Sequence, residues 1–418
     1  MHRLIMQHFG PIESCDIEVG DFQVFMGAQA SGKSTIAKAI FFFRTIKDDI
    51  FEVMMKRGTF SDNTYSLRNT VNRHLHNKFM QLFGSSRGMR KSMELTYVYN
   101  DDSKITISLS PSKDIYVKYS SNLLGYFKQN ENSAIFTDGD KNFIKKELNE
   151  LFSDDYETIF IPAGRSLITL LTTQLNYIYS SMNDDQKSSL DYCTQKYVER
   201  ILKIRGSFGE GISGYLDWKK KTSLVPFDAG KARRAIQIID KILKGKYVFT
   251  ANEERLVLDS GRYVKINFTS SGQQETVWIF NILAYQLINN TKTFLILEEP
   301  EAHLYPDAQK YISELLVLFR NAGNSVLITT HSPYVLGAIN NLLYAKKIKT
   351  RDNTNEINKT VQQDIQLDEC RAYFIENGEK TDCIDDELGV ISNEVIDGAS
   401  EEINRTFDRL LKIEGGEE

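Results

Sequence analysis

The sequence contains no apolar run long enough to form a membrane-spanning helix. Its most apolar stretch, Ile36–Ile46, is interrupted by Lys38 and Arg44, whereas such a helix needs about 18 consecutive apolar residues. No signal-peptide pattern is visible at the start of the sequence either. We therefore expect a cytoplasmic protein without a membrane partner.

Cysteine is also scarce. The chain has 4 cysteines, which lie far apart and form no C-x-x-C pair: Cys15, Cys193, Cys370 and Cys383. This spacing argues against a disulfide framework and against a cysteine zinc site. We expect reduced thiols in the core or at the surface.

The remaining composition is that of a globular protein, but its charge is uneven. With 418 residues, 41% of them hydrophobic, the chain has room for two lobes or more. Residues 364–418 carry 17 acidic and 5 basic side chains, a net of −12, which leaves +7 on residues 1–363 given the total of −5. The acidic end could shield the basic body or bind a partner.

Basic residues are concentrated between residues 219 and 246. Such a run suits binding to the phosphate backbone of DNA, although a charge run is often only a solvated face. Both interpretations remain open from the sequence. The run contains Lys219, Lys220, Lys221, Lys231, Arg233, Arg234, Lys241, Lys244 and Lys246.

A glycine-rich loop near the N-terminus has the pattern G-x-x-x-x-G-K-[ST]. An apolar segment, residues 22–26, precedes it as a predicted strand, and residues 35–44 follow with helical spacing. Backbone N–H groups and the helix N-terminus would bind phosphates, Lys33 would reach the β- and γ-phosphates, and Ser34 would ligate Mg²⁺. The alternative is a Gly/Ser turn that caps a helix. The predicted nucleotide-binding residues are Gly27, Ala28, Gln29, Ala30, Ser31, Gly32, Lys33, Ser34 and Thr35.

Two adjacent carboxylates end a second apolar strand, predicted over residues 293–299. We assign Glu298 to the metal and Glu299 to the attacking water, which it would orient or deprotonate. Two acids after a strand can also be a solvated strand end. Here a third apolar strand, residues 325–329, leads to His331, which can contact a γ-phosphate and sense its loss.

A fourth segment, Ser270-Ser271-Gly272-Gln273, precedes a predicted helix over residues 275–287. Taken alone, it suits an ordinary helix N-cap. The two interpretations are compatible, because a helix N-terminus is also where an anion binds.

Together these motifs resemble the ATP-binding-cassette ATPases, and within them the soluble OLD, RecF and SMC-like branch. Residues 270–274 look like the signature motif, residues 298–304 like the Walker B and D-loop segment, and residues 330–333 like the switch segment. Phe9-Gly10-Pro11-Ile12 resembles the first hairpin of the branch. Two positions depart from the usual pattern: Ser271-Gly272 replaces two glycines, and Glu298 replaces an aspartate.

This resemblance implies an α/β fold: an ABC ATPase head with a mixed or parallel core sheet, an antiparallel β subdomain and an inserted helical arm. It implies ATP and Mg²⁺ as cofactors. It also implies a homodimer or higher homo-oligomer in which Ser270, Ser271, Gly272 and Gln273 of one subunit face the nucleotide of the other. A strand followed by Pro-x-x-Arg places Arg165 beside the nucleotide or between the lobes. Gln174 is a weak candidate for the Q-loop residue.

We expect four parts: an N-terminal ATPase lobe (residues 1–165, with an antiparallel sheet from residue 93), a helical insert (166–246), a C-terminal ATPase lobe (247–345) and an acidic segment (346–418). The helical insert is core or a contact for a second chain. After His331, 87 residues remain, without a recognisable TOPRIM nuclease pattern. A last amphipathic helix is predicted from residue 396 to residue 410.

The expected function is that of an ATP-hydrolysing dimeric clamp. Compact ATPases of this branch look like those that act with a separate nuclease or toxin in bacterial anti-phage defence, or in DNA maintenance. The alternatives are a slow-turnover scaffold that holds such an effector and, third, a transporter nucleotide-binding subunit. The 243 positions between Gly27 and Ser270 argue against the transporter.

Overall fold

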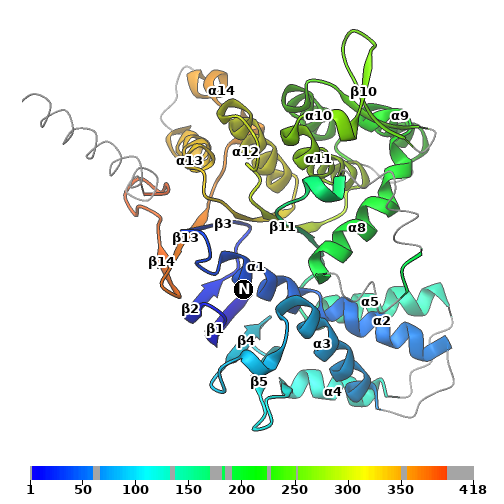
Figure 1. Ribbon diagram of the computed structural model, residues 1–418, viewed down its shortest axis with the longest axis vertical. Helices are drawn as coiled ribbons and strands as arrows, with labels where there is room; N and C mark the ends of the chain where they lie inside the picture. Colours follow the sequence, from blue (N-terminus) through cyan, green and yellow to red (C-terminus); the bar gives the residue numbers. More distant parts are fainter. Residues whose placement is uncertain are drawn as a thin grey trace, which may run out of the picture.

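Three β-sheets organise the described part of the computed structural model (Figure 1). The described residues are 2–59, 66–131, 137–169, 181–183, 191–223, 227–250, 253–349 and 355–392. The predicted helix around residues 167–177, its Gln174 and the predicted helix at 396–410 lie wholly or mostly outside these ranges. None of the described helices is long and apolar enough to cross a membrane.

The main sheet has six strands in the order β14-β13-β3-β12-β11-β7. The five strands from β13 to β7 are parallel, so their carboxyl ends lie at one edge, where binding sites of such sheets form. The strands are β3 (Phe22–Met26), β7 (Glu157–Ile161), β11 (Thr293–Glu298), β12 (Ser325–Thr329), β13 (Arg371–Glu376) and the antiparallel β14 (Glu379–Asp382).

A second sheet of five antiparallel strands confirms the predicted β subdomain. Its buried side chains alternate along each strand, as Leu95 and Tyr97 do on β4, because successive side chains point to opposite faces. The strand order is β2 (Ile12–Glu18), β1 (Arg3–Phe9), β4 (Glu94–Val98), β5 (Lys104–Leu109) and β6 (Ile115–Tyr119).

The main sheet separates two hydrophobic cores. On β11, Leu295 and Leu297 belong to one core and Phe294 and Ile296 to the other. Because both faces are covered, every residue of the central strands β3, β11 and β12 is buried and most are apolar, as is usual in parallel sheets. The core on the antiparallel-sheet side contains α1 (Lys33–Arg44), α2 (Ile46–Thr59), α3 (Leu67–Phe83), α4 (Ser121–Gln129) and α5 (Asp138–Leu151).

The other core contains most of the remaining helices. The predicted apolar stripe on α8 (Tyr192–Ile204) is buried at Cys193, Tyr197, Ile201 and Ile204, so it is core. Within the predicted helical insert, α9 (Gly211–Thr222) and α10 (Ala229–Leu243) pack against α11 (Ser271–Asn289), and α10 also packs against α12 (Pro306–Asn321). The other described α-helices and strands are α13 (Pro333–Ile348), α14 (Glu356–Thr360) and a small sheet of β8 (Lys246–Thr250), β9 (Glu253–Val257) and β10 (Tyr263–Lys265).

The acidic segment after residue 346 contributes to the main sheet, which the sequence analysis did not predict. Strand β13 pairs with β3, the strand that leads into the glycine-rich loop. The turn between β13 and β14 contacts the first hairpin, because Gly378 O accepts hydrogen bonds from Glu13 N (2.9 Å) and Ser14 N (3.2 Å). Residues 371–382 are therefore part of the folded body.

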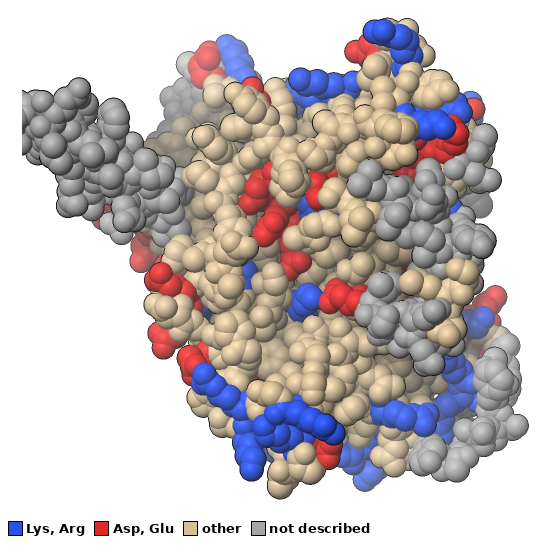
Figure 2. All heavy atoms as spheres, viewed as in Figure 1, with Lys and Arg blue, Asp and Glu red and all other residues tan. Residues whose placement is uncertain are grey.

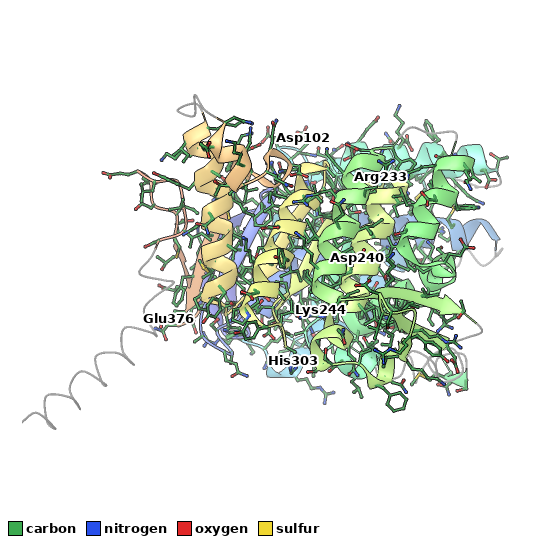
Figure 3. The ribbon with its side chains drawn as sticks, turned by 90° about the horizontal axis from the view of Figure 1, so that it is seen from above. Asp102, Arg233, Asp240, Lys244, His303 and Glu376 are labelled. Atoms are coloured by element: carbon green, nitrogen blue, oxygen red, sulfur yellow. The ribbon has the colours of Figure 1, made fainter. Side chains whose placement is uncertain are left out.

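The basic run of residues 219–246 does not form one patch. Figure 3 shows Arg233 and Lys244 at opposite ends of α10. Several other members have partners: Lys219 donates to Asn289 Oδ1 (2.9 Å), and Arg234 pairs with Asp364 (3.5 Å). In Figure 2, Lys and Arg side chains gather instead along the lower edge, where β4 and β5 lie in Figure 1.

Candidate functional site

The glycine-rich loop joins the carboxyl end of β3 to the start of α1, as the sequence predicts. Gly27 has φ 137°, and a Cβ atom there would lie 2.2 Å from Ile375 O of β13. Gly32 has φ 108°, and a Cβ atom there would lie 2.5 Å from Ile12 Cδ1. Only glycine fits either position. No side chain caps the N-terminus of α1, so its first N–H groups are free to bind an anion.

The side chain of Lys33 turns back onto this loop. Its ammonium donates to Gly27 O (3.0 Å) and Ala28 O (2.8 Å). Burial lowers the pKa of Lys33, although three nearby carboxylates, those of Glu299, Glu301 and Glu298, act in the opposite direction. The cation therefore lies between the phosphate loop and the acidic end of β11.

Glu298 is buried at the end of β11, and its two carboxylate oxygens differ. Oε2 accepts a hydrogen bond from Ala163 N (3.1 Å), whereas Oε1 is buried and has no partner among the described residues. An unpaired buried carboxylate oxygen is costly unless something binds it. Such an oxygen suits a Mg²⁺ ion that shares its remaining ligands with nucleotide oxygens and water.

The next residue, Glu299, has a left-handed backbone with φ 44° and a side chain that is 43% exposed. Its N–H donates to Thr329 O of β12 (2.9 Å). His331 Nε2 lies 3.7 Å from Glu299 Oε1. The structure thus brings together two residues that the sequence separates, and it leaves both side chains open to a nucleotide.

Glu301 was not predicted to be part of the site. Its Oε1 accepts hydrogen bonds from Thr330 Oγ1 (2.7 Å) and from the backbone N–H of His331 (2.9 Å), while its buried Oε2 has no partner within the described ranges. Glu301 therefore ties the segment after β11 to the segment that carries His331. The third acid of Glu298-Glu299-Pro300-Glu301 was the only sequence signal for this role.

Arg165 is wholly buried behind these carboxylates. Its guanidinium donates to Pro162 O (2.7 Å), Glu298 O (2.6 Å) and Glu299 O (2.9 Å). It also lies 3.3 Å from Glu275 Oε2. From the sequence, Arg165 is expected beside the nucleotide or between the lobes. Here its partners are backbone carbonyls and one carboxylate of the protein itself.

The signature segment begins α11 with a capping box. Ser270 Oγ accepts a hydrogen bond from Gln273 N (3.4 Å), and Gln273 Oε1 accepts one from Ser270 N (3.1 Å). Ser270 and Ser271 are exposed, while a Cβ atom on Gly272 would lie 2.6 Å from His303 O. Among the described residues, no hydrogen bond joins Ser270, Ser271 or Gly272 to the glycine-rich loop.

A hollow of about 510 Å³ adjoins the loop. It extends from the exposed Ser34 past Lys38 to the first hairpin at Phe9 and to Arg90. Its size and position suit the base and ribose of a nucleotide whose phosphates lie on the loop.

Large apolar side chains are exposed beside three of the motifs. Phe268 precedes the signature segment and is 75% exposed, Tyr305 follows the D-loop and is 75% exposed, and Tyr334 follows His331 and is 57% exposed. Figure 3 shows His303 of the D-loop and Glu376, at the end of β13, on the same side of the molecule. Burial of such exposed apolar side chains favours contact with another surface.

Within the described ranges, no group of three or more His, Cys, Asp or Glu side chains could hold a metal ion alone. A Mg²⁺ site here would therefore need oxygen atoms from the nucleotide in addition to Ser34 and Glu298. That is the usual arrangement for Mg²⁺, which keeps waters and substrate phosphates among its ligands.

The chain is similar in sequence or in fold to known ATPase domains. A family model described as "AAA ATPase domain" matches residues 1–336. No curated protein sequence matches the chain. Among solved structures, the Smc head domain of Pyrococcus furiosus bound to the C-terminal domain of ScpA is 12% identical with TM-score 0.42, covering 97% of this chain and 100% of that one. The SMC head domain from Thermotoga maritima is 14% identical with TM-score 0.38, covering 91% and 97%.

Proposed function

The chain belongs to the AAA ATPase domain family and is an ATPase, and from this premise we propose that it works as an ATP-gated dimeric clamp. The observation that carries the proposal is the convergence of Lys33, Glu298, Glu299 and His331 at the carboxyl edge of the main sheet. Each of these groups has a chemical role in phosphoryl transfer, and such transfer depends on positioning and charge stabilisation.

In this proposal the phosphates lie on the N–H groups of the loop and of α1. Lys33 leaves the carbonyls of Gly27 and Ala28 and pairs with the β- and γ-phosphates, where it offsets their charge. When bound, Mg²⁺ would neutralise phosphate charge, held by Ser34 and by the open Oε1 of Glu298. Glu299 accepts a proton from the attacking water, and the neighbouring His331 donates to the γ-phosphate.

The dimer follows from the signature segment. Because Ser270 and Ser271 are exposed and unconnected to the loop of their own chain, we propose that they bind the γ-phosphate held by a second copy. Phe268, Tyr305 and Tyr334 support this contact, since burying exposed apolar side chains favours association. Hydrolysis would remove the γ-phosphate and open the dimer.

We also propose that a separate nuclease or toxin carries the effector activity, in bacterial anti-phage defence or DNA maintenance. The support for this pathway is the resemblance to compact ATPases of the OLD and SMC-like branch. DNA is a further proposed partner, and the exposed Arg87 and Lys91, which precede β4, are suited to phosphate contacts. Binding of a DNA duplex that weakens as salt rises, and that is lost when Arg87 and Lys91 are changed to Glu, would support DNA as a partner.

The test of the clamp is Glu299→Gln. This variant keeps the size of the side chain but cannot accept a proton, so we expect kcat for ATP hydrolysis to fall at least about 100-fold while ATP still binds. With hydrolysis blocked, an ATP-bound dimer should persist in light scattering after size-exclusion chromatography.

Glu379→Gln is the matched control, because Glu379 is an exposed carboxylate on β14. It should hydrolyse ATP and change its oligomeric state as the wild type does. If Glu299→Gln neither slows hydrolysis nor stabilises an ATP-bound dimer, the proposed function is wrong.

A further inference from the structure

The segment from Pro162 to Ser166 connects two functional parts of the same chain. On one side it contacts the turn that carries Glu298 and Glu299, and on the other it contacts Glu275 in the second turn of α11, the helix that the signature segment begins. Arg165 lies 110 positions from Glu275 and 133 positions from Glu298 in the sequence. The Walker B and signature motifs do not by themselves predict that residues 162–166 connect them.

The contacts on the α11 side are made by a single carboxylate and a single carbonyl. Glu275 Oε2 accepts from Arg165 N (3.1 Å), and Glu275 Oε1 accepts from Ser166 N (2.9 Å). Glu275 O accepts from Arg165 Nε (3.2 Å). Glu275 is therefore fully engaged with the 162–166 segment, and it is only 1% exposed.

The contacts on the catalytic side are made by the two terminal nitrogens of Arg165. They donate to the carbonyls of Glu298 and Glu299. Glu299 is the residue with the left-handed backbone, and Glu298 comes directly before it. A non-glycine residue in this conformation costs on the order of 1 kcal/mol or more, so the surroundings must hold it there. Arg165 is the described side chain that donates to both carbonyls.

Only arginine suits this position. The planar guanidinium presents donors in a fixed fork, so it reaches Glu275 with Nε and the carbonyls with its two terminal nitrogens at once. A lysine has the charge but a single nitrogen. Because replacing a whole buried ion pair by apolar residues is often neutral for stability, the arginine at this position is better explained by the geometry of its donors.

We propose that Arg165 and Glu275 are a positioning pair that ties the catalytic turn at Glu299 to the start of α11. A shift of Ser270–Gly272 on binding the nucleotide of a second copy would then move Glu299 in the same subunit. The pair would thus report occupancy of one ATP site to the other. This inference rests on the proposed function, because the signature segment meets a nucleotide only in the dimer.

The first measurement compares Arg165→Lys and Glu275→Gln with Asp154→Asn. The last variant is the control, because Asp154 pairs with Arg44 in a site that is as deeply buried but does not contact the motifs. We expect kcat to fall about 10- to 100-fold in the two test variants, as a small misplacement of a catalytic group does. The dissociation constant for a fluorescent ATP analogue should change less than about 3-fold, and the control should keep its kcat.

The second measurement is a double-mutant cycle on kcat with Glu299→Gln. If Arg165 acts through Glu299, the variant carrying both Arg165→Lys and Glu299→Gln should hydrolyse ATP no more slowly than Glu299→Gln alone. Additive losses would overturn the inference, as would loss of kcat in the Asp154→Asn control equal to that in Arg165→Lys. Because Glu299→Gln by itself tests the clamp, the two failures are distinguishable.

Discussion

Two buried arginines lie at opposite edges of the main sheet and have different kinds of partner. Arg44 ends α1 at the amino edge, where it pairs with Asp154 (2.8 Å), contacts His2 Nδ1 (3.0 Å) and covers the ring of Phe294 at 3.9 Å. Arg165 lies at the carboxyl edge, where most of its partners are main-chain carbonyls. Arg44 contacts side chains from several elements and so holds those elements together. Arg165 binds main-chain carbonyls and so fixes the backbone path of one turn.

The comparison shows that burial alone does not separate a stabilising residue from a positioning one. Arg44 is 5% exposed and Arg165 is 0% exposed, so both side chains are buried. The identity of the partners decides the role. Changes at the amino edge should therefore alter stability, and changes at the carboxyl edge should alter turnover.

The largest expected effect in this comparison is on stability, for Asp154→Asn. Removing this carboxylate leaves Arg44 buried without its ion pair and weakens the contact with Lys47 (3.4 Å). We expect a loss of about 3 kcal/mol in the free energy of unfolding, measured by urea denaturation. The kcat of the folded protein should stay within about 2-fold of wild type. An unchanged urea midpoint would show that the pair is not stabilising.

A smaller effect is expected at the carboxyl edge, for Glu301→Ala. This change removes the acceptor of the Thr330 hydroxyl and of the His331 N–H, so His331 is no longer held near Glu299. We expect kcat to fall roughly 10-fold, about 1.4 kcal/mol, with the urea midpoint nearly unchanged. Glu301→Gln keeps an acceptor oxygen and should lose less than about 3-fold. Equal losses in the two variants would show that the charge matters and the hydrogen bonds do not.

The smallest effect is a pH dependence at the amino edge. Burial, together with the nearby Arg44 cation, lowers the pKa of His2 to about 4. The unfolded chain takes up this proton near pH 6.5, so the stability due to neutral His2 is present above that pH and is lost as the pH falls toward 4. Between pH 7.5 and about 5.8, we expect the free energy of unfolding in urea to fall about 1 kcal/mol less in His2→Gln than in wild type. The same loss in both proteins would contradict this account.

Local elements that lead into motifs were well predicted from the sequence. Residues 22–26 and 325–329 form β3 and β12, and the three predicted antiparallel strands from residue 93 are β4, β5 and β6. Apolar runs and the alternation of apolar and polar residues reflect burial of residues that are neighbours in the sequence. A short stretch of sequence is therefore enough to predict such a strand. The glycines at 27 and 32 were predicted for the same reason, since the backbone demands them locally.

Elements whose partners are distant in the sequence were not predicted. Strand β13 lies in an acidic region, and its neighbour β3 precedes it by more than 340 residues. The sequence around Glu275 does not distinguish it from any other polar residue of a helix, and only the fold places Arg165 beside it. The basic run at 219–246 appeared continuous in the sequence, but α10 carries Arg233 and Lys244 to opposite ends.

Local motifs are enough to predict which side chains suit phosphate chemistry, because the spacing of these motifs reflects short-range backbone geometry. The predicted side chains are Lys33, Ser34, Glu298, Glu299 and His331. How these side chains are held depends on the whole fold. Parallel pairing of β3, β12 and β11 brings the motif ends to one edge, and long-range packing places Glu301 and Arg165 against the carbonyls and N–H groups of the turns. Such contacts depend on the whole fold, because each joins residues that no local pattern relates.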